Sequence, residues 1–374
     1  MCIISWLKVF LKIILNNNFF LNKKVLITGS TGFKGSWLSI WLDLLGAKIY
    51  GLALDPPTSP SLFEEANLNT IIKNNIIDIK DTEKVINTIK KIEPDYIFHL
   101  AAQPIVSLSY LKTVETWNTN VIGTINILES LRLLNNECIG IIITSDKCYE
   151  NQEWEWGYRE NDLLGGKDPY SASKGSAELA FSSYHRSFFS NNDDSKIKIC
   201  SARAGNVIGG GDWADNRIVP DCIKAWTKGN SVDIKSPEST RPFQHVLEPL
   251  NGYITLAEKL KLNKNLAGHS FNFGPPSNFN YQVIDVVKEL SKKWNDASWE
   301  INEKQNNYSE SKLLKLNCDK ALSLLNWEPT LDFNTTINMT SDWYYSFYKN
   351  KNLNVLEKCR QQIKDFMNKK MINK

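Results

Sequence analysis

Three glycines, Gly29, Gly32 and Gly35, lie between an apolar stretch and an amphipathic one, and this arrangement strongly constrains the fold. Residues 25–27 are Val-Leu-Ile, which is typical of a buried strand. The residues at 37, 38, 41, 42 and 45 are Trp or Leu and share one helical face. The spacing G-x-x-G-x-x-G therefore predicts a sharp turn from a strand into a helix.

A turn of this kind brings the backbone close to a pyrophosphate and points the N–H groups of the following helix at it. Its position between a first strand and a first helix favours dinucleotide binding over the alternative, a tight turn without a ligand.

A second strand is predicted over residues 48–54, and Asp55 follows it, twenty residues beyond Gly35. An acidic side chain at this place can hold the ribose hydroxyls of NAD and repel the 2′-phosphate of NADP. The alternative is a turn aspartate before Pro56 and Pro57.

Strands and helices then alternate: strands over 75–79, 95–100 and 139–144, and helices over 81–91 and 114–134. The strand at 139–144 is continuously apolar, as expected for a strand buried on both faces. The alternation predicts an α/β fold with a doubly wound parallel (Rossmann) sheet. Asp78 and Ile79 would end the third strand, and Ala101 and Ala102 after the fourth would leave room for a cofactor at the carboxyl edge.

Two polar groups of residues in the middle of the chain are candidates for catalytic residues. Asp168 and Pro169 suit the start of a helix on which Tyr170 and Lys174, four residues apart, share a face. An ammonium beside a tyrosine lowers its pKa, so Tyr170 could accept a proton near neutral pH. The strand at 139–144 ends in Thr-Ser-Asp-Lys (residues 144–147), which is either a functional loop or a helix cap.

The strict alternation weakens after a strand at 197–201. Residues 203–213 are rich in glycine and suit either a backbone that wraps a ligand or a plain flexible loop. Short strands are predicted at 232–235 and 270–273, and helices at 249–262, 281–294 and 319–325. We expect an extension (1–18), an NAD-binding domain (19–205), a smaller interleaved α/β part for the substrate (206–345) and a basic, partly solvated helical tail from about 346 to 374.

Composition argues against nucleic-acid binding, a disulfide framework and a metal site. The 374 residues carry a net charge of only +3, which gives no global field for nucleic acid. Seven scattered cysteines without a C-x-x-C pair fit a reducing compartment and argue against a disulfide framework or a zinc site, and four histidines make a His-rich metal site unexpected.

The segment 3–15 is apolar but is interrupted by Lys8 and Lys12, and it is too short to span a membrane. No small-residue cleavage site follows it. We interpret it as an amphipathic extension or a mis-assigned start, and we expect a cytoplasmic protein without stable membrane insertion.

Several motifs together resemble the extended short-chain dehydrogenase/reductases, and within them the CDP-glucose 4,6-dehydratase family. The resemblance covers about residues 19–327, and its motifs are residues 28–38, 53–58, 99–104, 144–149, 156–160, 203–213 and 241–249. Lys147 stands where dTDP-glucose enzymes have Glu, as in the CDP-sugar group, whereas Ser30 stands where that group usually has His.

The resemblance implies a reaction. Tyr170 would take the proton of the glucose C4 hydroxyl while bound NAD takes the hydride, Ser145 would bind the C4 oxygen and Lys174 would orient the cofactor ribose. Asp146 would protonate the leaving C6 hydroxyl, and we hypothesise that Lys147 removes the C5 proton, which requires a depressed lysine pKa. The product would be CDP-4-dehydro-6-deoxyglucose, a precursor in deoxysugar and O-antigen lipopolysaccharide synthesis.

The resemblance also implies binding residues and a homodimeric or homotetrameric assembly. The expected NAD-binding residues are Gly29, Thr31, Gly32, Phe33, Lys34, Gly35, Asp55, Asp78, Ile79, Leu100, Ala101, Ala102, Tyr170 and Lys174, with Gln103, Asn206, Arg241 and His245 expected on the substrate CDP-glucose. Arg241 suits a diphosphate because a guanidinium matches phosphate oxygens; His245 could equally be a structural histidine. A sugar-nucleotide 4-epimerase, a dehydratase of another nucleotide sugar and a non-catalytic NAD-binding protein remain alternatives.

Overall fold

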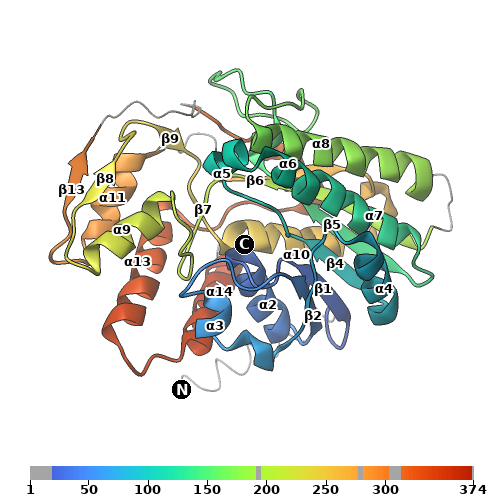
Figure 1. Cartoon of the computed structure of the whole chain (residues 1–374), viewed down its shortest axis with the longest axis horizontal. Helices are drawn as coiled ribbons and strands as arrows, with labels where there is room; N and C mark the ends of the chain where they lie inside the picture. Colours follow the sequence, from blue (N-terminus) through green and yellow to red (C-terminus); the bar gives the residue numbers. More distant parts are fainter. Residues whose placement is uncertain (1–18, 191–194, 277–280, 303–312, 373–374) are drawn as a thin grey trace.

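The computed structural model describes residues 19–190, 195–276, 281–302 and 313–372. The predicted extension 1–18 lies outside these ranges. A seven-stranded sheet forms the centre (Figure 1), in the order β11-β6-β5-β4-β1-β2-β3. Its strands are β1 Lys24–Thr28, β2 Lys48–Ala53, β3 Ile72–Ile76, β4 Tyr96–His99, β5 Cys138–Ile143, β6 Ile197–Ala204 and β11 Ser270–Phe273.

All neighbouring strands of this sheet pair in parallel. The order reverses direction at β1, whose two neighbours are β2 and β4. Every residue of β5 is buried, in agreement with its unbroken apolar sequence. The predicted doubly wound Rossmann sheet is therefore confirmed, and the carboxyl ends of β1, β4 and β5 meet at one edge, where such sheets bind ligands.

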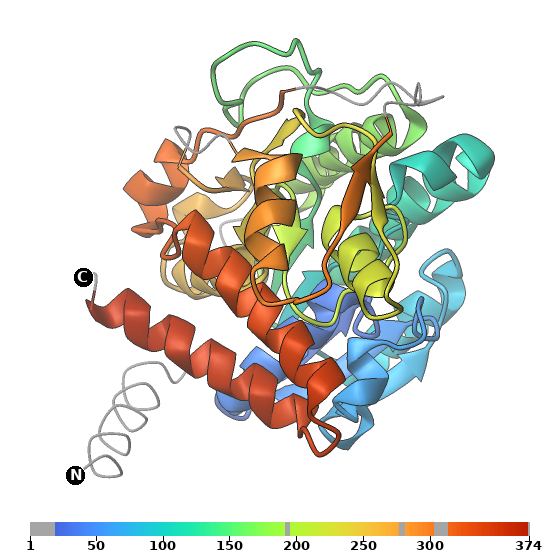
Figure 2. The same ribbon diagram turned by 90° about the vertical axis from the view of Figure 1, so that its left-hand side faces the viewer.

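Helices cover both faces of the sheet. One face carries α4 (Thr82–Ile92), α7 (Gly123–Arg132) and α8 (Pro169–Tyr184), which share an apolar core with the strands. The other carries α2 (Phe33–Leu44) and α10 (Leu247–Leu262), and α14 (Val355–Ile372) packs on α2. In Figure 2, α13 (Phe333–Lys349) and α14 run across the lower half of the molecule.

A smaller group of elements lies at the left of Figure 1, beside the carboxyl edge of the sheet. It contains α9 (Ile218–Trp226), α11 (Val283–Ser291) and a parallel pair, β8 (Val232–Ile234) with β13 (Trp299–Ile301). The remaining short elements are α3 Leu62–Glu65, η1 Leu68–Thr70, α5 Val106–Leu111, α6 Thr113–Trp117, η2 Asn118–Ile122, η3 Asp146–Cys148, η4 His185–Phe189, β7 Val207–Ile208, β9 Thr240–Arg241, β10 Gln244–His245, η5 Lys264–Leu266, β12 Tyr281–Gln282 and α12 Asp319–Leu325.

Two predictions need correction. The third strand is Ile72–Ile76, so the predicted strand at 75–79 is shifted and its last residues form the turn before α4. The predicted helix at 114–134 is interrupted by the π-helical turn η2. The C-terminal tail is helical over Val355–Ile372 and partly exposed, as predicted, and its buried side packs on α2: Phe366 lies against Trp41 with ring centroids 5.6 Å apart, and Arg360 pairs with Asp43 at 2.7 Å.

Candidate active site

The glycine turn is built as its spacing predicts. Gly29 has a φ of +71°, and a Cβ placed there would lie 2.9 Å from the backbone of Ala101. A Cβ on Gly35 would lie 2.1 Å from the carbonyl oxygen of Gly29. Both positions therefore require glycine, and β1, the loop after β4 and α2 approach one another closely as a consequence.

The start of α2 suits a phosphate group. Gly32 is its N-cap, and no side chain caps the first turn, which also lacks an acidic residue. Thr31 is anchored by a hydrogen bond from its hydroxyl to the carbonyl oxygen of Leu54, 2.9 Å away. Uncapped N–H groups beside a tight glycine turn fit the pyrophosphate of a dinucleotide.

The other predicted cofactor residues lie along the same edge of the sheet. Asp55 follows β2 and is exposed, and Leu100 and Ala101 follow β4, where their N–H groups donate to Thr28. Asp78 lies in the turn before α4 and accepts a hydrogen bond from the N–H of Lys80 at 2.9 Å. The remaining two also lie near the carboxyl ends of strands: Ile79, which is buried, and Ala102, which is half-buried.

Ser145 and Asp146 follow β5 and are both buried. The Ser145 hydroxyl donates to Oδ1 of Asp146 at 3.0 Å, whereas Oδ2 of Asp146 is buried and has no hydrogen-bond partner in the described structure. Burial raises the pKa of this carboxyl, against the opposing charges of Lys147 and Lys34. A buried carboxylic acid with one unpartnered oxygen is suited to donate a proton to a bound molecule.

Tyr170 and Lys174 lie on the first turns of α8, and the carboxylate of Asp168 caps this helix by accepting from the N–H of Ser171 at 2.9 Å. The phenol of Tyr170 lies close enough to the Ser145 hydroxyl for that group to influence its pKa, so the two polar groups predicted from separate stretches meet. Lys174 is buried, which lowers its pKa to about 8.

The expected lowering of the Tyr170 pKa is wrong for this structure. Burial raises the pKa of Tyr170 to about 12 and outweighs the influence of the Ser145 hydroxyl and the charge of Arg217, which both act in the opposite direction. The prediction rested on the four-residue spacing of Tyr170 and Lys174, which does not reveal that the phenol is buried.

Lys34, predicted as a cofactor residue, and two residues that the sequence analysis did not name, Tyr253 and Arg217, complete the cluster. Lys34 enters from α2 with its Nζ 3.4 Å from the hydroxyl of Tyr253, which is fully buried. Burial and the nearby cations Lys174 and Arg217 lower the pKa of Lys34 to about 8. Arg217 precedes α9 and pairs with Asp212 at 2.9 Å. Lys34, Lys174 and Arg217 thus lie near one another, and Arg217 and Lys174 each have an acidic neighbour, Asp212 and Glu178.

The side chain of Gln103, which was expected to bind the substrate, makes hydrogen bonds within the protein. Its side-chain amide donates to the carbonyl oxygen of Ile105 at 3.0 Å and to the Thr116 hydroxyl at 2.9 Å. Asn120, in the π-helical turn, accepts from the N–H of Gln103 at 2.8 Å and donates to Ser173 at 2.9 Å. These bonds tie the loop after β4 to α8, and the sequence analysis did not single out Asn120.

The predicted substrate residues are distributed unevenly. Asn206 and Arg241 are half-buried on the segments that follow β6 and α9. His245 is completely buried, its ring lies edge-on to Trp37, and burial lowers its pKa to about 3. His245 is therefore a neutral core side chain, in line with its structural alternative.

Lys147 is half-buried and adjoins Asp146, whose pKa its charge lowers. Its backbone N–H donates to the Ser145 hydroxyl at 3.2 Å, so the short helix η3 fixes residues 145–147 as one turn.

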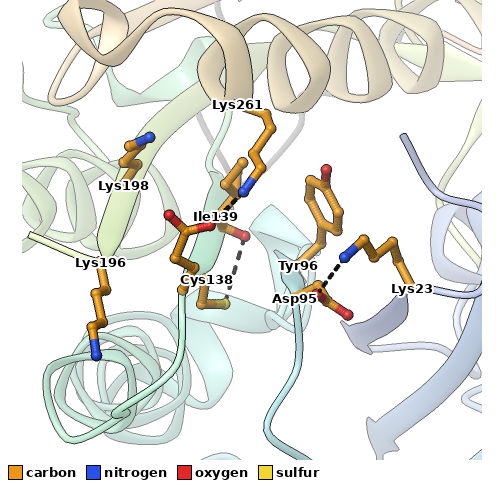
Figure 3. Close-up of a pocket in the computed structure, with 9 residues that line it drawn as sticks. Lys23, Asp95, Tyr96, Cys138, Ile139, Lys196, Lys198 and Lys261 are labelled. Carbon is orange, nitrogen blue, oxygen red and sulfur yellow. Dashed lines mark hydrogen bonds and ion pairs between the residues drawn. The ribbon is translucent and has the colours of Figure 1, made fainter. Parts of the chain in front are cut away.

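A small pocket of about 60 Å³ lies at the opposite edge of the sheet (Figure 3), where the strands begin. Two of its lysines pair with acidic side chains, Lys23 with Asp95 at 3.1 Å and Lys261 with Glu137 at 2.5 Å. This pocket is remote from the Tyr170 cluster. Within the described ranges no group of side chains suits a metal ion, the cysteines form no disulfide, and no helix is long and apolar enough to cross a bilayer.

Comparison with known proteins places the chain among sugar-nucleotide enzymes. The sequence model of the GDP-mannose 4,6 dehydratase family matches residues 26–340. CDP-glucose 4,6-dehydratase of Salmonella typhimurium is 44% identical over 356 residues, which are 94% of this chain and 98% of that enzyme. dTDP-D-glucose 4,6-dehydratase of Dictyostelium discoideum is 27% identical over 285 residues, 72% of this chain and 61% of that protein.

The fold is shared with solved structures. UDP-glucuronic acid 4-epimerase from Bacillus cereus, solved with UDP-glucuronic acid and NAD, superimposes with a TM-score of 0.72 at 23% identity, over 87% of this chain and 100% of that one. The extent of the family match and of the identity to the Salmonella enzyme establish that this chain belongs to the GDP-mannose 4,6 dehydratase family, whose members are NAD-dependent sugar-nucleotide dehydratases.

Proposed function

We propose that this protein converts CDP-D-glucose to CDP-4-dehydro-6-deoxy-D-glucose and water, with NAD retained through the turnover. The observation that carries the proposal is the meeting of Ser145, Asp146 and Tyr170 in one buried cluster, close to Lys34 of the glycine turn. The 44% identity to an enzyme of that name supports the choice of substrate.

The residues divide the work as follows. Tyr170 as phenolate takes the proton of the C4 hydroxyl, a form that the charge of Arg217 favours against the effect of burial, and Ser145 hydrogen-bonds the C4 oxygen. Bound NAD supplies the hydride acceptor at C4 and the hydride donor at C6. The C4 ketone acidifies the C5 proton, which Lys147 removes, while the carboxyl of Asp146, whose pKa burial raises, donates a proton to the departing C6 hydroxyl.

The glycine turn and α2 would hold the cofactor diphosphate, and Asp55 would bind the adenosine ribose. The half-buried Arg241 and Asn206, together with Arg217, are the proposed contacts of the substrate diphosphate and sugar. In domain terms, residues 19–205 would bind NAD and 206–345 largely the sugar nucleotide.

An apolar surface supports a homodimer. Leu111 and Val114, on α5 and α6, are more than 70% exposed, and Leu179 on α8 is 60% exposed. These three helices pack against one another in the upper part of Figure 1, and exposed apolar side chains on neighbouring helices are typical of an interface. We propose that a second copy covers them.

The test is an assay with CDP-, UDP-, GDP- and dTDP-glucose. A 4-keto-6-deoxy product absorbs in alkali, so absorbance with CDP-glucose alone supports the proposal. An epimerised sugar that does not absorb would indicate a 4-epimerase, and no reaction with any of the four would indicate a non-catalytic NAD-binding protein.

Two finer proposals follow from this activity. The product would feed deoxysugar synthesis, including O-antigen lipopolysaccharide, and the enzyme would act in the cytoplasm. Recovery of the protein in the membrane pellet after cell fractionation would contradict the second.

A further inference from the structure

A buried ion pair lies beneath the active site. Arg203 on β6 and Glu178 on α8 are linked by a hydrogen bond of 2.8 Å, and their side chains are only 3% and 1% exposed. Burial alone would raise the pKa of Glu178, but the charge and hydrogen bond of Arg203 hold it below its usual value. Neither residue belongs to the groups that we assign to the reaction.

The carboxylate of Glu178 binds three strands at once. Its Oε1 accepts from the Thr144 hydroxyl at 2.5 Å, and its Oε2 accepts from Ser201 at 2.8 Å and Ser270 at 3.1 Å. Thr144, Ser201 and Ser270 lie at or next to β5, β6 and β11. The single side chain of Glu178 thus joins α8 to three strands of the sheet.

The guanidinium of Arg203 binds the segment that follows the catalytic turn. It donates to the hydroxyl of Tyr149 at 2.8 Å and to the carbonyl oxygen of Glu160 at 3.0 Å, and it lies 4.9 Å from the centre of the Tyr149 ring. Tyr149 in turn donates to Asn272 of β11 at 2.7 Å.

These contacts flank both halves of the active site in sequence. Thr144 directly precedes Ser145, Tyr149 lies two residues after Lys147, and Glu178 lies one helical turn after Lys174. Along the chain the two halves are joined by the long segment 150–168, which contains no helix and no extended strand, and η3 also packs directly on α8. The buried pair adds hydrogen bonds to residues on both sides of this contact.

Stability alone explains this pair poorly. A buried ion pair loses solvation on folding, and well-packed apolar residues often replace one without loss of stability. A fully hydrogen-bonded network, by contrast, holds the elements that it joins in one arrangement. We propose that Glu178 and Arg203 are positioning residues that hold the Tyr170–Lys174 helix against the Ser145–Asp146 turn. The roles of those four groups rest on the proposed function.

Glu178 also acts on Lys174 through its charge. The groups that face Lys174 are Glu178 on its own helix, Cys148 of η3, Lys34 of α2 and His99 of β4. Burial keeps Cys148 protonated and His99 uncharged, and Lys34 is a cation, so Glu178 is the anion of this set. Its charge raises the pKa of Lys174 against the effect of burial.

The experiment compares Glu178→Gln and Arg203→Lys with the wild-type holoenzyme. Glu178→Gln should lower kcat at least about tenfold with KM little changed, because misplacement of about 1 Å can cost about a hundredfold. It should also move the alkaline limb of the pH–kcat profile to lower pH, since Lys174 loses its neighbouring anion. Arg203→Lys keeps the cation but loses the forked geometry, so kcat should fall while the alkaline limb stays in place.

The matched control is Glu357→Gln, which breaks an exposed Glu–Arg pair on α14 and should leave kcat and the pH profile unchanged. A measurement without substrate is hydrogen exchange of the backbone amides. Both variants should exchange faster at residues 145–149 and 169–175 than the wild type, and equally at the glycine turn 29–35.

Wild-type kcat in folded Glu178→Gln or Arg203→Lys would overturn the proposal, as would a loss of kcat that merely follows the folded fraction. If Glu178→Gln does not fold, Arg203→Lys decides alone. The comparison uses whichever nucleotide glucose the wild type converts, and the exchange measurement needs none. Failure of CDP-glucose turnover therefore contradicts the proposed function without contradicting the positioning role.

Discussion

At the scale of single residues, Asp146 shows how a proposed catalytic role conflicts with stability. Its carboxyl is buried, one oxygen has no partner among the described residues, and burial raises its pKa. Above about pH 4, the ordinary pKa of an aspartate, ionisation of this group lowers the free energy of the unfolded state. It lowers the free energy of the folded state less, because the folded pKa is higher, so the free energy of unfolding of the wild type falls as the pH rises.

Asparagine has nearly the same shape and carries no charge. We therefore expect Asp146→Asn to have a higher Tm than the wild type at pH 7, and this gain to vanish as the pH falls to about 4. Dehydration should be lost in the same variant. Calorimetry at several pH values, with the exposed Asp365→Asn as control, measures the difference. A Tm that falls at pH 7 would show that the charge of Asp146 is stabilising.

Lys147 is the proposed base for the C5 proton. Lys147→Ala should block exchange of the C5 proton with deuterated solvent, while oxidation at C4 still produces reduced cofactor that a single-turnover measurement can detect. Lys167→Ala, a change of an exposed lysine in the following loop, should leave both events intact. Normal C5 exchange in Lys147→Ala would exclude this role.

At the scale of elements, the glycine turn contains two glycines that the fold requires and one that only a bound ligand would require. Gly29 and Gly35 have no room for a Cβ, but a Cβ on Gly32 would meet only the Gly29 carbonyl oxygen at 3.4 Å, and the φ of Gly32 is −80°. The protein itself therefore tolerates alanine at position 32.

We expect Gly32→Ala to keep its Tm in the absence of cofactor but to bind NAD at least about tenfold more weakly, because the methyl group would lie where the diphosphate approaches the backbone. Calorimetric titration with NAD measures this. Gly35→Ala is the contrasting variant and should lose stability as well. Unchanged NAD affinity in Gly32→Ala would place the diphosphate elsewhere.

The sequence predicted elements best where the apolar pattern was regular. β1, β5 and α12 were found nearly as the structure has them. β3 was shifted because residues 76–79 are more apolar than Ile72–Ile76, and the true register is set by pairing with β2, which a single sequence does not display. Helix α13 escaped prediction because Asn, Thr and Ser, which are weak helix formers, fill much of it.

At the scale of the whole molecule, the spacing of Tyr170 and Lys174 and the polar end of β5 sufficed to predict half of the cluster. Tyr253 and Arg217, which the sequence analysis did not name, come from distant segments, and only the folded chain brings them to Lys34 and the cluster. Their convergence depends on the sheet order and on helix packing, so no local pattern could have shown it.

The exposed apolar helices predict assembly. Val114→Glu combined with Leu179→Lys should convert the proposed dimer to a monomer, because each change puts a charge into the covered surface. Light scattering after size-exclusion chromatography measures the mass. Leu262→Lys, at a position 69% exposed on α10, is the control and should remain dimeric. A wild type that is already monomeric would contradict the proposed interface.

The most direct test of the account follows the hydrogen at C4. CDP-glucose labelled with deuterium at C4 is incubated with the holoenzyme, and the product is examined by NMR. The account predicts that the deuterium appears at C6 of a 4-keto product, since one cofactor removes it and returns it within the same turnover. Deuterium found again at C4, or a product without a ketone, would contradict it.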